Sequence, residues 1–128
     1  MTLRLTRRLA FAAGHRIPNH ASQCRHLHGH RYTLEITLAG EPADTEGASD
    51  EGMVADFSDA KTIALRELVD KWDHAFLAHA GDHAVVAFLA TLPDHKTVVL
   101  PFVPTAEHLA ADAFRILDAA YAASCGTR

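Results

Sequence analysis

The chain has 128 residues, of which 48% are hydrophobic and 22% charged, and its formal net charge is −4. This length and composition suit a single globular domain over residues 1–128 and are not those of a disordered chain. The negative charge argues against a nucleic-acid binder, because such proteins usually display a basic surplus. No apolar run is long enough to cross a bilayer, which argues against a membrane protein.

The first predicted element is a strand from Leu3 to about Ala13, because its apolar residues fall mainly on odd positions. It ends at His15. A loop over residues 16–23 follows, with Pro18 and Asn19 as breakers. A second strand with alternating apolar residues runs from about His30 to Ala39, and residues 40–52 form a solvated loop.

The second half of the sequence favours helices. Ser58 can cap a helix whose apolar residues recur at helical spacing as far as Trp72. A short helix is expected over residues 82–91, and residues 97–100 form a short extended run. Thr105 is the expected N-cap of a final helix that reaches about residue 123. The order of two strands, helices, an extended run and a last helix indicates an α+β protein.

Residues 24–30, Cys-Arg-His-Leu-His-Gly-His, form the densest group of chemically capable side chains. His28 and His30 are two residues apart, so a strand sends both imidazoles to one face. By itself such a pair is better explained as a surface feature without function. His15, at the end of the first strand, adds a third imidazole, and three imidazoles with an open fourth position are the ligand set of a catalytic zinc. Cys24 as fourth ligand would instead close a structural site.

The remaining cysteine and histidines receive simpler interpretations. Cys24 and Cys125 are read as thiols of a cytoplasmic protein, because no secretory leader precedes them. His26 could compete as a ligand if residues 24–30 were all extended. The other histidines lack ligand spacing and are interpreted as solvated or locally hydrogen-bonded: His20, His79, His83, His95 and His108.

Several segments, taken together, resemble motifs of the 6-pyruvoyl-tetrahydropterin synthase and 6-carboxy-tetrahydropterin synthase family. They run in family order over about residues 9–110. The similar segments are Phe11–Arg16 (first zinc-ligand motif), Cys24–His30 (Cys-x-x-x-His-Gly-His), Gly52–Phe57 (entry to the first helix), Asp73-His74 (Asp-His pair) and Pro104–Glu107 (start of the second helix). The four-residue step from Cys24 to His28 is similar to the bacterial carboxy branch of queuosine biosynthesis.

The resemblance implies a tunnelling fold, in which an antiparallel four-stranded sheet carries helices on one face. It also implies a homo-oligomer, a trimer or hexamer, with active sites between subunits. The implied reaction is a carbon-carbon lyase step on 7,8-dihydroneopterin triphosphate, giving 6-carboxy-tetrahydropterin, acetaldehyde and triphosphate. The alternatives are a 6-pyruvoyl-tetrahydropterin synthase, which eliminates triphosphate, and a non-catalytic zinc-stabilised assembly module.

Residue roles follow from the same resemblance. Zinc is implied on His15, His28 and His30, and Cys24 is the implied base, since a thiolate beside a dication has a lowered pKa. Asp73 and His74 are the implied proton relay, although a structural pair at a helix end explains them as well without the resemblance. Thr105 and Glu107 are the candidate substrate contacts, and Glu107 is equally explained by the helix dipole.

The family's chain continues beyond its second helix into two more strands, the last of which carries a pterin-anchoring Glu. Here no Glu follows Glu107 and no alternating apolar run follows Tyr121. We therefore expect the C-terminal strand pair to be absent, leaving two main strands with unpaired edges. A truncated or frameshifted chain, or partner subunits that cover the gap, would account for this, and pterin is expected to bind poorly.

Overall fold

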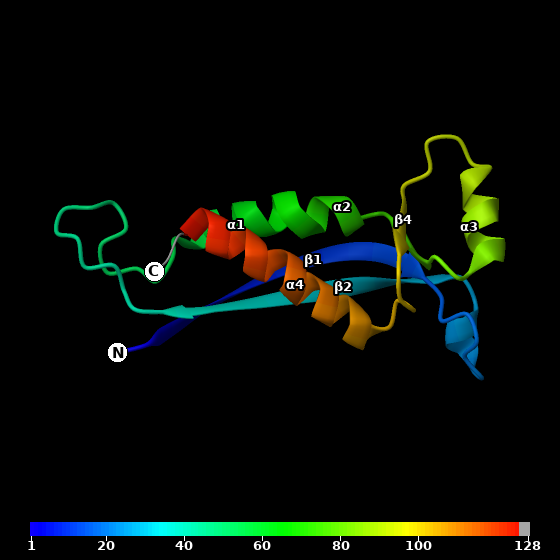
Figure 1. Cartoon of the computed structure of the whole chain (residues 1–128), viewed down its shortest axis with the longest axis horizontal. Coiled ribbons are helices and arrows are strands. Elements are labelled where there is room, and N and C mark those ends of the chain that lie inside the picture. The colour runs from blue at the N-terminus through cyan, green and yellow to red at the C-terminus, as the bar shows by residue number, and fades with distance from the viewer. Residues whose placement is uncertain (126–128) are drawn as a thin grey trace.

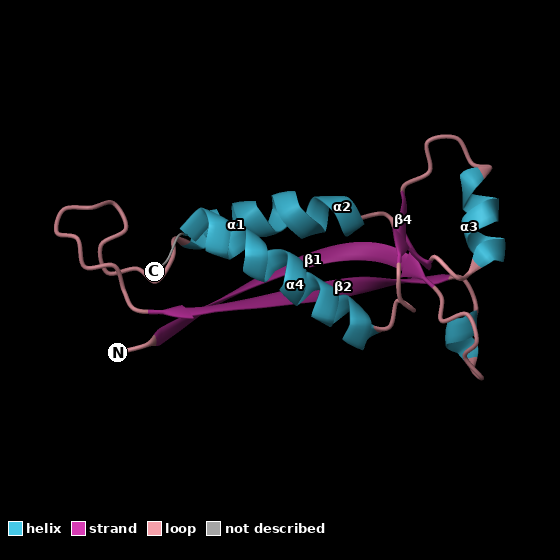
Figure 2. Ribbon diagram, viewed as in Figure 1, coloured by secondary structure: helices cyan, strands magenta, loops and turns pink. Residues whose placement is uncertain are grey.

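The computed structural model describes residues 1–125, and its architecture is α+β, as the sequence predicts (Figure 1, Figure 2). The side chain of Cys125 lies outside the described part. The strands are β1 (Leu3–His15), β2 (His28–Gly40), β3 (Phe76–His79) and β4 (Thr97–Leu100), and the helical segments are η1 (Gln23–Arg25), α1 (Phe57–Ala64), η2 (Leu65–Val69), α2 (Asp70–Trp72), α3 (His83–Ala90) and α4 (Ala106–Cys125).

β1 and β2 form a long antiparallel ribbon in which every residue from Leu3 to His15 has a partner on β2. The odd positions of β1 face the core, where Leu5, Leu9 and Phe11 are buried. The matching even positions of β2 are buried or half-buried, except His30, which is exposed. The pairing runs to the ends of both strands, so His15 lies opposite His28.

The sheet has four strands in the order β2-β1-β3-β4, and it is mixed. β3 pairs parallel with β1 through Gly14 and His15 only, and β4 pairs parallel with β3. The parallel pairing corrects the expectation of an antiparallel sheet, and β3 is a strand that the sequence did not predict, whereas β4 coincides with the extended run expected over residues 97–100. α3 connects β3 to β4, and such a helical crossover produces parallel strands. Gly14 allows the close contact, because a Cβ there would meet the Phe76 ring at 2.8 Å.

α1, η2 and α2 follow one another without a break and lie with α4 on one face of the ribbon (Figure 2). The first of these helices is capped by Asp56, whose carboxylate accepts from the Ser58 backbone N–H at 2.7 Å. The cap is therefore two residues before the predicted Ser58. The turn η2 is π-helical and buries both Leu68 and Val69. Helices on one face are confirmed.

The core lies between the ribbon and these helices and reaches the ribbon end that carries the histidines. The Phe11 ring stacks on Tyr32 at a centroid distance of 5.2 Å and meets Trp72 edge-on at 6.2 Å. From α4, Leu109, Ala113, Leu117 and Tyr121 complete the core. Within residues 1–125 no helix is both long and apolar enough to cross a bilayer.

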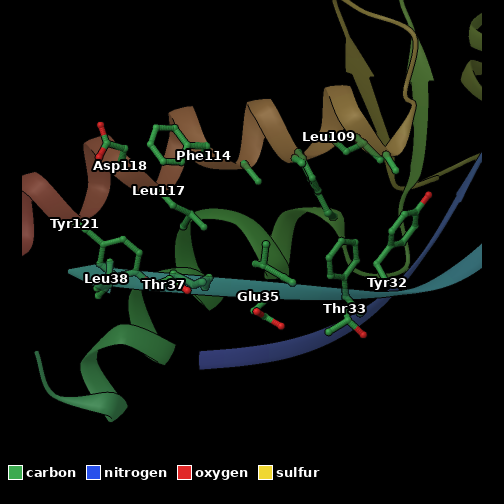
Figure 3. A pocket seen from close by; sticks show the side chains of 17 residues that line it. Tyr32, Thr33, Glu35, Thr37, Leu38, Leu109, Phe114, Leu117, Asp118 and Tyr121 are labelled. Atoms are coloured by element: carbon green, nitrogen blue, oxygen red, sulfur yellow. The ribbon is translucent and has the colours of Figure 1, made fainter. Parts of the chain in front are cut away.

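A groove of about 370 Å³ runs between β2 and α4 (Figure 3). Leu38 lies at its strand side and Leu109 and Leu117 at its helix side, and the Phe114 ring at its rim is 73% exposed. β2 pairs only with β1 among the described strands, so its other edge is open beside this groove.

Candidate metal centre and catalytic groups

Three imidazoles meet at the end of the ribbon, and they are the three that the sequence predicts as metal ligands. His15 and His28 are cross-strand partners, while His30 lies opposite Ala13 on the same face. The ring centroids are 4.6 Å apart for His15 and His28, and 4.7 Å apart for His28 and His30. One nitrogen from each ring lies within 4.8 Å of the others, which is a spacing that a single metal ion can bridge.

Hydrogen bonds orient two of these rings. The Nδ1 of His15 lies 2.8 Å from the carbonyl of Pro104, and the Nδ1 of His28 lies 2.6 Å from the carbonyl of His26. Each Nδ1–H therefore donates to a carbonyl, which leaves the lone pair on Nε2. Both Nε2 atoms are buried and have no hydrogen-bond partner. Buried polar atoms are rarely left this way, so the two nitrogens fit a metal ion.

Burial favours the neutral, metal-binding form of the first ligand. His15 is 6% exposed, and this burial lowers its pKa below the ordinary value, with smaller contributions from His28 and His30. The Tyr32 hydroxyl lies 3.3 Å from the Nδ1 of His15, and burial raises the pKa of that phenol, so it stays protonated. Tyr32 is a contact that the sequence reasoning missed, although its position two residues after His30 puts it on the same face.

Cys24 lies outside the group of possible ligands. It is exposed in the short helical turn η1, and its backbone carbonyl accepts a hydrogen bond from Ile17 N–H at 2.8 Å. His26 is exposed and also outside the group, and it contributes only its carbonyl to orient His28. Within residues 1–125 the structure therefore assembles an imidazole set in which the chain supplies three ligands.

Asp73 and His74 form a pair in the turn after α2. Asp73 Oδ2 lies 3.0 Å from His74 Nδ1, and Asp73 Oδ1 accepts from the Ala12 backbone N–H at 3.0 Å. The Ala12 hydrogen bond and then His74 hold the pKa of Asp73 below its ordinary value. His74 has a φ of 60°, an unfavourable value for a residue with a side chain, and its N–H donates to the Ala12 carbonyl.

The structure does not gather this pair with the three imidazoles. His74 lines a shallow depression that one member of the imidazole group, His30, also borders; the other residues that line it are Ala12, Ala13, Gly14, Gly29, Arg31 and Ala75. Alternation along the strands puts the side chains of Ala12 and Arg31 on the face opposite the metal group, whereas His30 belongs to that group. Neither Asp73 nor His74 belongs to the group of three imidazoles whose nitrogens lie within 4.8 Å of one another.

Thr105 and Glu107 lie at the start of α4. The Thr105 hydroxyl accepts from the His108 backbone N–H at 3.1 Å, which is the predicted N-cap. Its neighbour Pro104 is the residue whose carbonyl orients His15, so this helix start adjoins the metal group. Glu107 is exposed in the first turn. No sequence signal pointed to the Pro104 contact, because a backbone carbonyl leaves no trace in residue type.

Comparison with known proteins places this geometry in a family. The profile described as 6-pyruvoyl tetrahydropterin synthase matches residues 4–126. The chain belongs to the 6-pyruvoyl tetrahydropterin synthase family. It is 39% identical over 108 residues to a protein of Rickettsia bellii named 6-carboxy-5,6,7,8-tetrahydropterin synthase, covering 84% of this chain and 75% of that protein. A protein of the same name from Haemophilus influenzae is 31% identical over 109 residues, covering 84% and 76%.

Two solved structures have a fold similar to that of this chain. An uncharacterized protein from Wolinella succinogenes superposes with a TM-score of 0.70 at 21% identity, covering 94% of this chain and 86% of the other. The Caenorhabditis elegans 6-pyruvoyl tetrahydropterin synthase superposes with a TM-score of 0.64 at 24% identity, covering 94% and 79%. At these identities the likeness concerns the fold.

Proposed function

We propose that this chain is a zinc-dependent lyase that converts 7,8-dihydroneopterin triphosphate and water to 6-carboxy-5,6,7,8-tetrahydropterin, acetaldehyde and triphosphate. The observation that carries the proposal is the pair of buried, unpartnered Nε2 atoms of His15 and His28, in a group where His30 brings a third ligand atom within 4.8 Å. The names of the relatives from Rickettsia bellii and Haemophilus influenzae support the pterin product. Queuosine biosynthesis and a cytoplasmic location remain predictions from the sequence.

Zinc is the metal that three neutral imidazoles with an open position suit best. When bound, it would act as a Lewis acid that stabilises negative charge developing on the substrate's side-chain oxygens. The residues of the chain supply orientation. Pro104 and His26 fix the ring planes of His15 and His28 through Nδ1, and the Phe11–Tyr32 stack supports the His15 side of the group.

Two groups of the chain would move protons. Cys24 is exposed and precedes His28 of the imidazole group by four residues in the sequence. It is the proposed base that accepts a proton from the substrate side chain. Asp73 stays ionised because its pKa is lowered, and it accepts from the Nδ1–H of His74. That hydrogen bond leaves His74 Nε2 as the atom that exchanges a proton with substrate. Thr105 and Glu107 are the proposed pterin contacts beside Pro104.

We also propose that two copies of the chain complete each active site in a homo-oligomer, a trimer or hexamer. Asp73 and His74 are not members of the imidazole group, and the His74 side chain is 80% exposed, which leaves it available to a substrate held by another chain. The outer edge of β2 is open, and β1 pairs with β3 only at Gly14 and His15, so open strand edges are available on both sides of the ribbon.

A 6-pyruvoyl-tetrahydropterin synthase is the second candidate, and the description of the matching family profile favours it. Product analysis separates the two. Purified protein loaded with zinc and given dihydroneopterin triphosphate should release acetaldehyde with a carboxylated pterin. A pyruvoyl product without acetaldehyde would support the second candidate and leave the metal proposal intact.

The same assay tests the roles of individual residues. Cys24→Ala should lose turnover while keeping about one zinc per chain, since the three imidazoles are untouched. His28→Ala should lose the metal as well. Normal turnover by Cys24→Ala would refute its role as the base. Weakened zinc binding together with a lowered melting temperature in Cys24→Ala would favour a closed structural site instead.

A further inference from the structure

An ion pair joins the ends of two parallel strands next to the metal group. Arg16 follows β1 directly, and Asp82 lies three residues beyond β3. Parallel strands leave a sheet at the same edge, which brings these two residues together. Arg16 Nε donates to Asp82 Oδ2 at 2.7 Å and Nη2 to Oδ1 at 2.5 Å, a two-pronged contact. The side chain of Asp82 is 5% exposed and that of Arg16 26%.

Burial makes this pair unusual within residues 1–125. Asp82 and His15 are the two buried polar or charged residues of that part of the chain. The hydrogen bonds from Arg16 hold the pKa of Asp82 below its ordinary value, so the carboxylate is ionised at neutral pH. A buried carboxylate that lost its guanidinium partner would be left without compensation for its charge, so the contact is strongly favoured once formed.

The Arg16–Asp82 pair lies where the loop that carries Cys24 begins. Ile17, directly after Arg16, donates its backbone N–H to the Cys24 carbonyl at 2.8 Å. Every residue from His20 to Leu27 is exposed, so core packing does not hold this part of the loop. The backbone hydrogen bond between Ile17 and Cys24 therefore helps to determine where Cys24 lies, and Ile17 directly follows Arg16, the residue that Asp82 contacts.

We propose that Asp82 is a positioning residue that holds the Cys24 loop in place through Arg16 and Ile17. The buried carboxylate of Asp82 fixes the guanidinium of Arg16, and the guanidinium fixes the backbone where β1 ends. The hydrogen bond from Ile17 N–H to the Cys24 carbonyl then holds Cys24 relative to that backbone. The structural part of the proposal stands on these contacts alone, and its kinetic consequence rests on the proposed function.

Amide hydrogen exchange followed by NMR tests the structural part directly. In Asp82→Asn the Ile17 amide should exchange at least about tenfold faster than in the parent protein, because its hydrogen bond to Cys24 opens more often. The amides of the β1–β2 ladder and the zinc content should not change. Glu35→Gln is the matched control, since it removes the carboxylate of an exposed pair with Arg8 elsewhere on the ribbon, and Ile17 should keep its protection there.

The kinetic part uses the zinc-loaded protein. Asp82→Asn should lower kcat by about tenfold or more with little change in KM, because a displaced base slows the chemical step without removing a substrate contact. The doubly substituted Arg16→Asp, Asp82→Arg protein should recover part of both the exchange protection and kcat. A purely structural role predicts instead that stability falls while kcat per folded molecule is unchanged.

The outcomes separate this proposal from the proposed function. Unchanged Ile17 protection in folded Asp82→Asn overturns the positioning role, whatever the activity. If Asp82→Asn does not fold, Arg16→Lys takes its place, because it keeps the charge and loses the two-pronged contact, and it must show the same loss at Ile17. If the parent protein does not turn over pterin, the proposed function fails and the exchange experiment still decides the role of Asp82.

Discussion

Removing zinc should lower the melting temperature of this protein substantially. The metal would satisfy the two buried Nε2 atoms of His15 and His28, and an unsatisfied buried polar group costs about 1–3 kcal/mol. Zinc at about 100 times its dissociation constant adds about 2.7 kcal/mol to the free energy of unfolding. Unfolding a chain of 128 residues carries an entropy of about 0.27 kcal/mol/K, so this stabilisation corresponds to about 10 °C.

The measurement is a thermal melt of zinc-loaded protein, of protein treated with a chelator, and of the chelated protein after zinc is restored. His28→Gln should melt at the same temperature in all three conditions. His83→Gln is the control, because His83 is exposed at the start of α3 and outside the metal group, and it should respond like the parent protein. Equal melting temperatures for loaded and chelated parent protein would refute the reasoning from the orphaned nitrogens.

Three further outcomes are expected. Lys96→Met should lower the free energy of unfolding in urea by about 0.3–1 kcal/mol and reduce turnover. The reason is that the Lys96 ammonium lies at a helix end and donates to the Asp73 carbonyl there, at 2.6 Å. The lowered pKa of Asp82 stabilises the folded protein fully above its ordinary pKa of 3.8, and this stabilisation is lost as pH falls through the folded-state pKa. The free energy of unfolding, measured from pH 6 to 2, should therefore fall more steeply for the parent protein than for Asp82→Asn. Leu117→Ala should cost about 2–5 kcal/mol in chemical unfolding, and Phe114→Ala less than about 0.5, because Leu117 is 5% exposed and the Phe114 ring 73%.

The metal group was the part of the site most accessible to sequence reasoning. Period-two geometry puts His28 and His30 on one face, and the end of the apolar series on β1 puts His15 at the end of the ribbon. The structure joins them through strand register, since His15 lies opposite His28. A local pattern sufficed because the site is built on regular strands, whose side-chain directions follow from spacing alone.

The parts that sequence reasoning missed depend on contacts between distant segments. β3 is four residues long and has no alternating pattern, so periodicity gave no sign of it. Its pairing with Gly14 and His15 carries the chain to Asp82, and the contact of Arg16 with Asp82 spans 66 residues. Residue type suggests only that an arginine beside a metal ligand is available for an anion. That the buried carboxylate of Asp82 binds this arginine follows only from the folded structure.

β1 relates the two halves of the proposed catalytic machinery. At its end it carries His15, and at its edge the backbone of Ala12 accepts from His74 N–H and donates to the Asp73 carboxylate. The φ of 60° at His74 costs about 1–2 kcal/mol, and such a conformation persists when surrounding contacts over-determine it. Because both groups take their positions from one strand, strand pairing between copies would fix the distance from one chain's metal to another chain's His74. Assembly itself would then set the catalytic geometry.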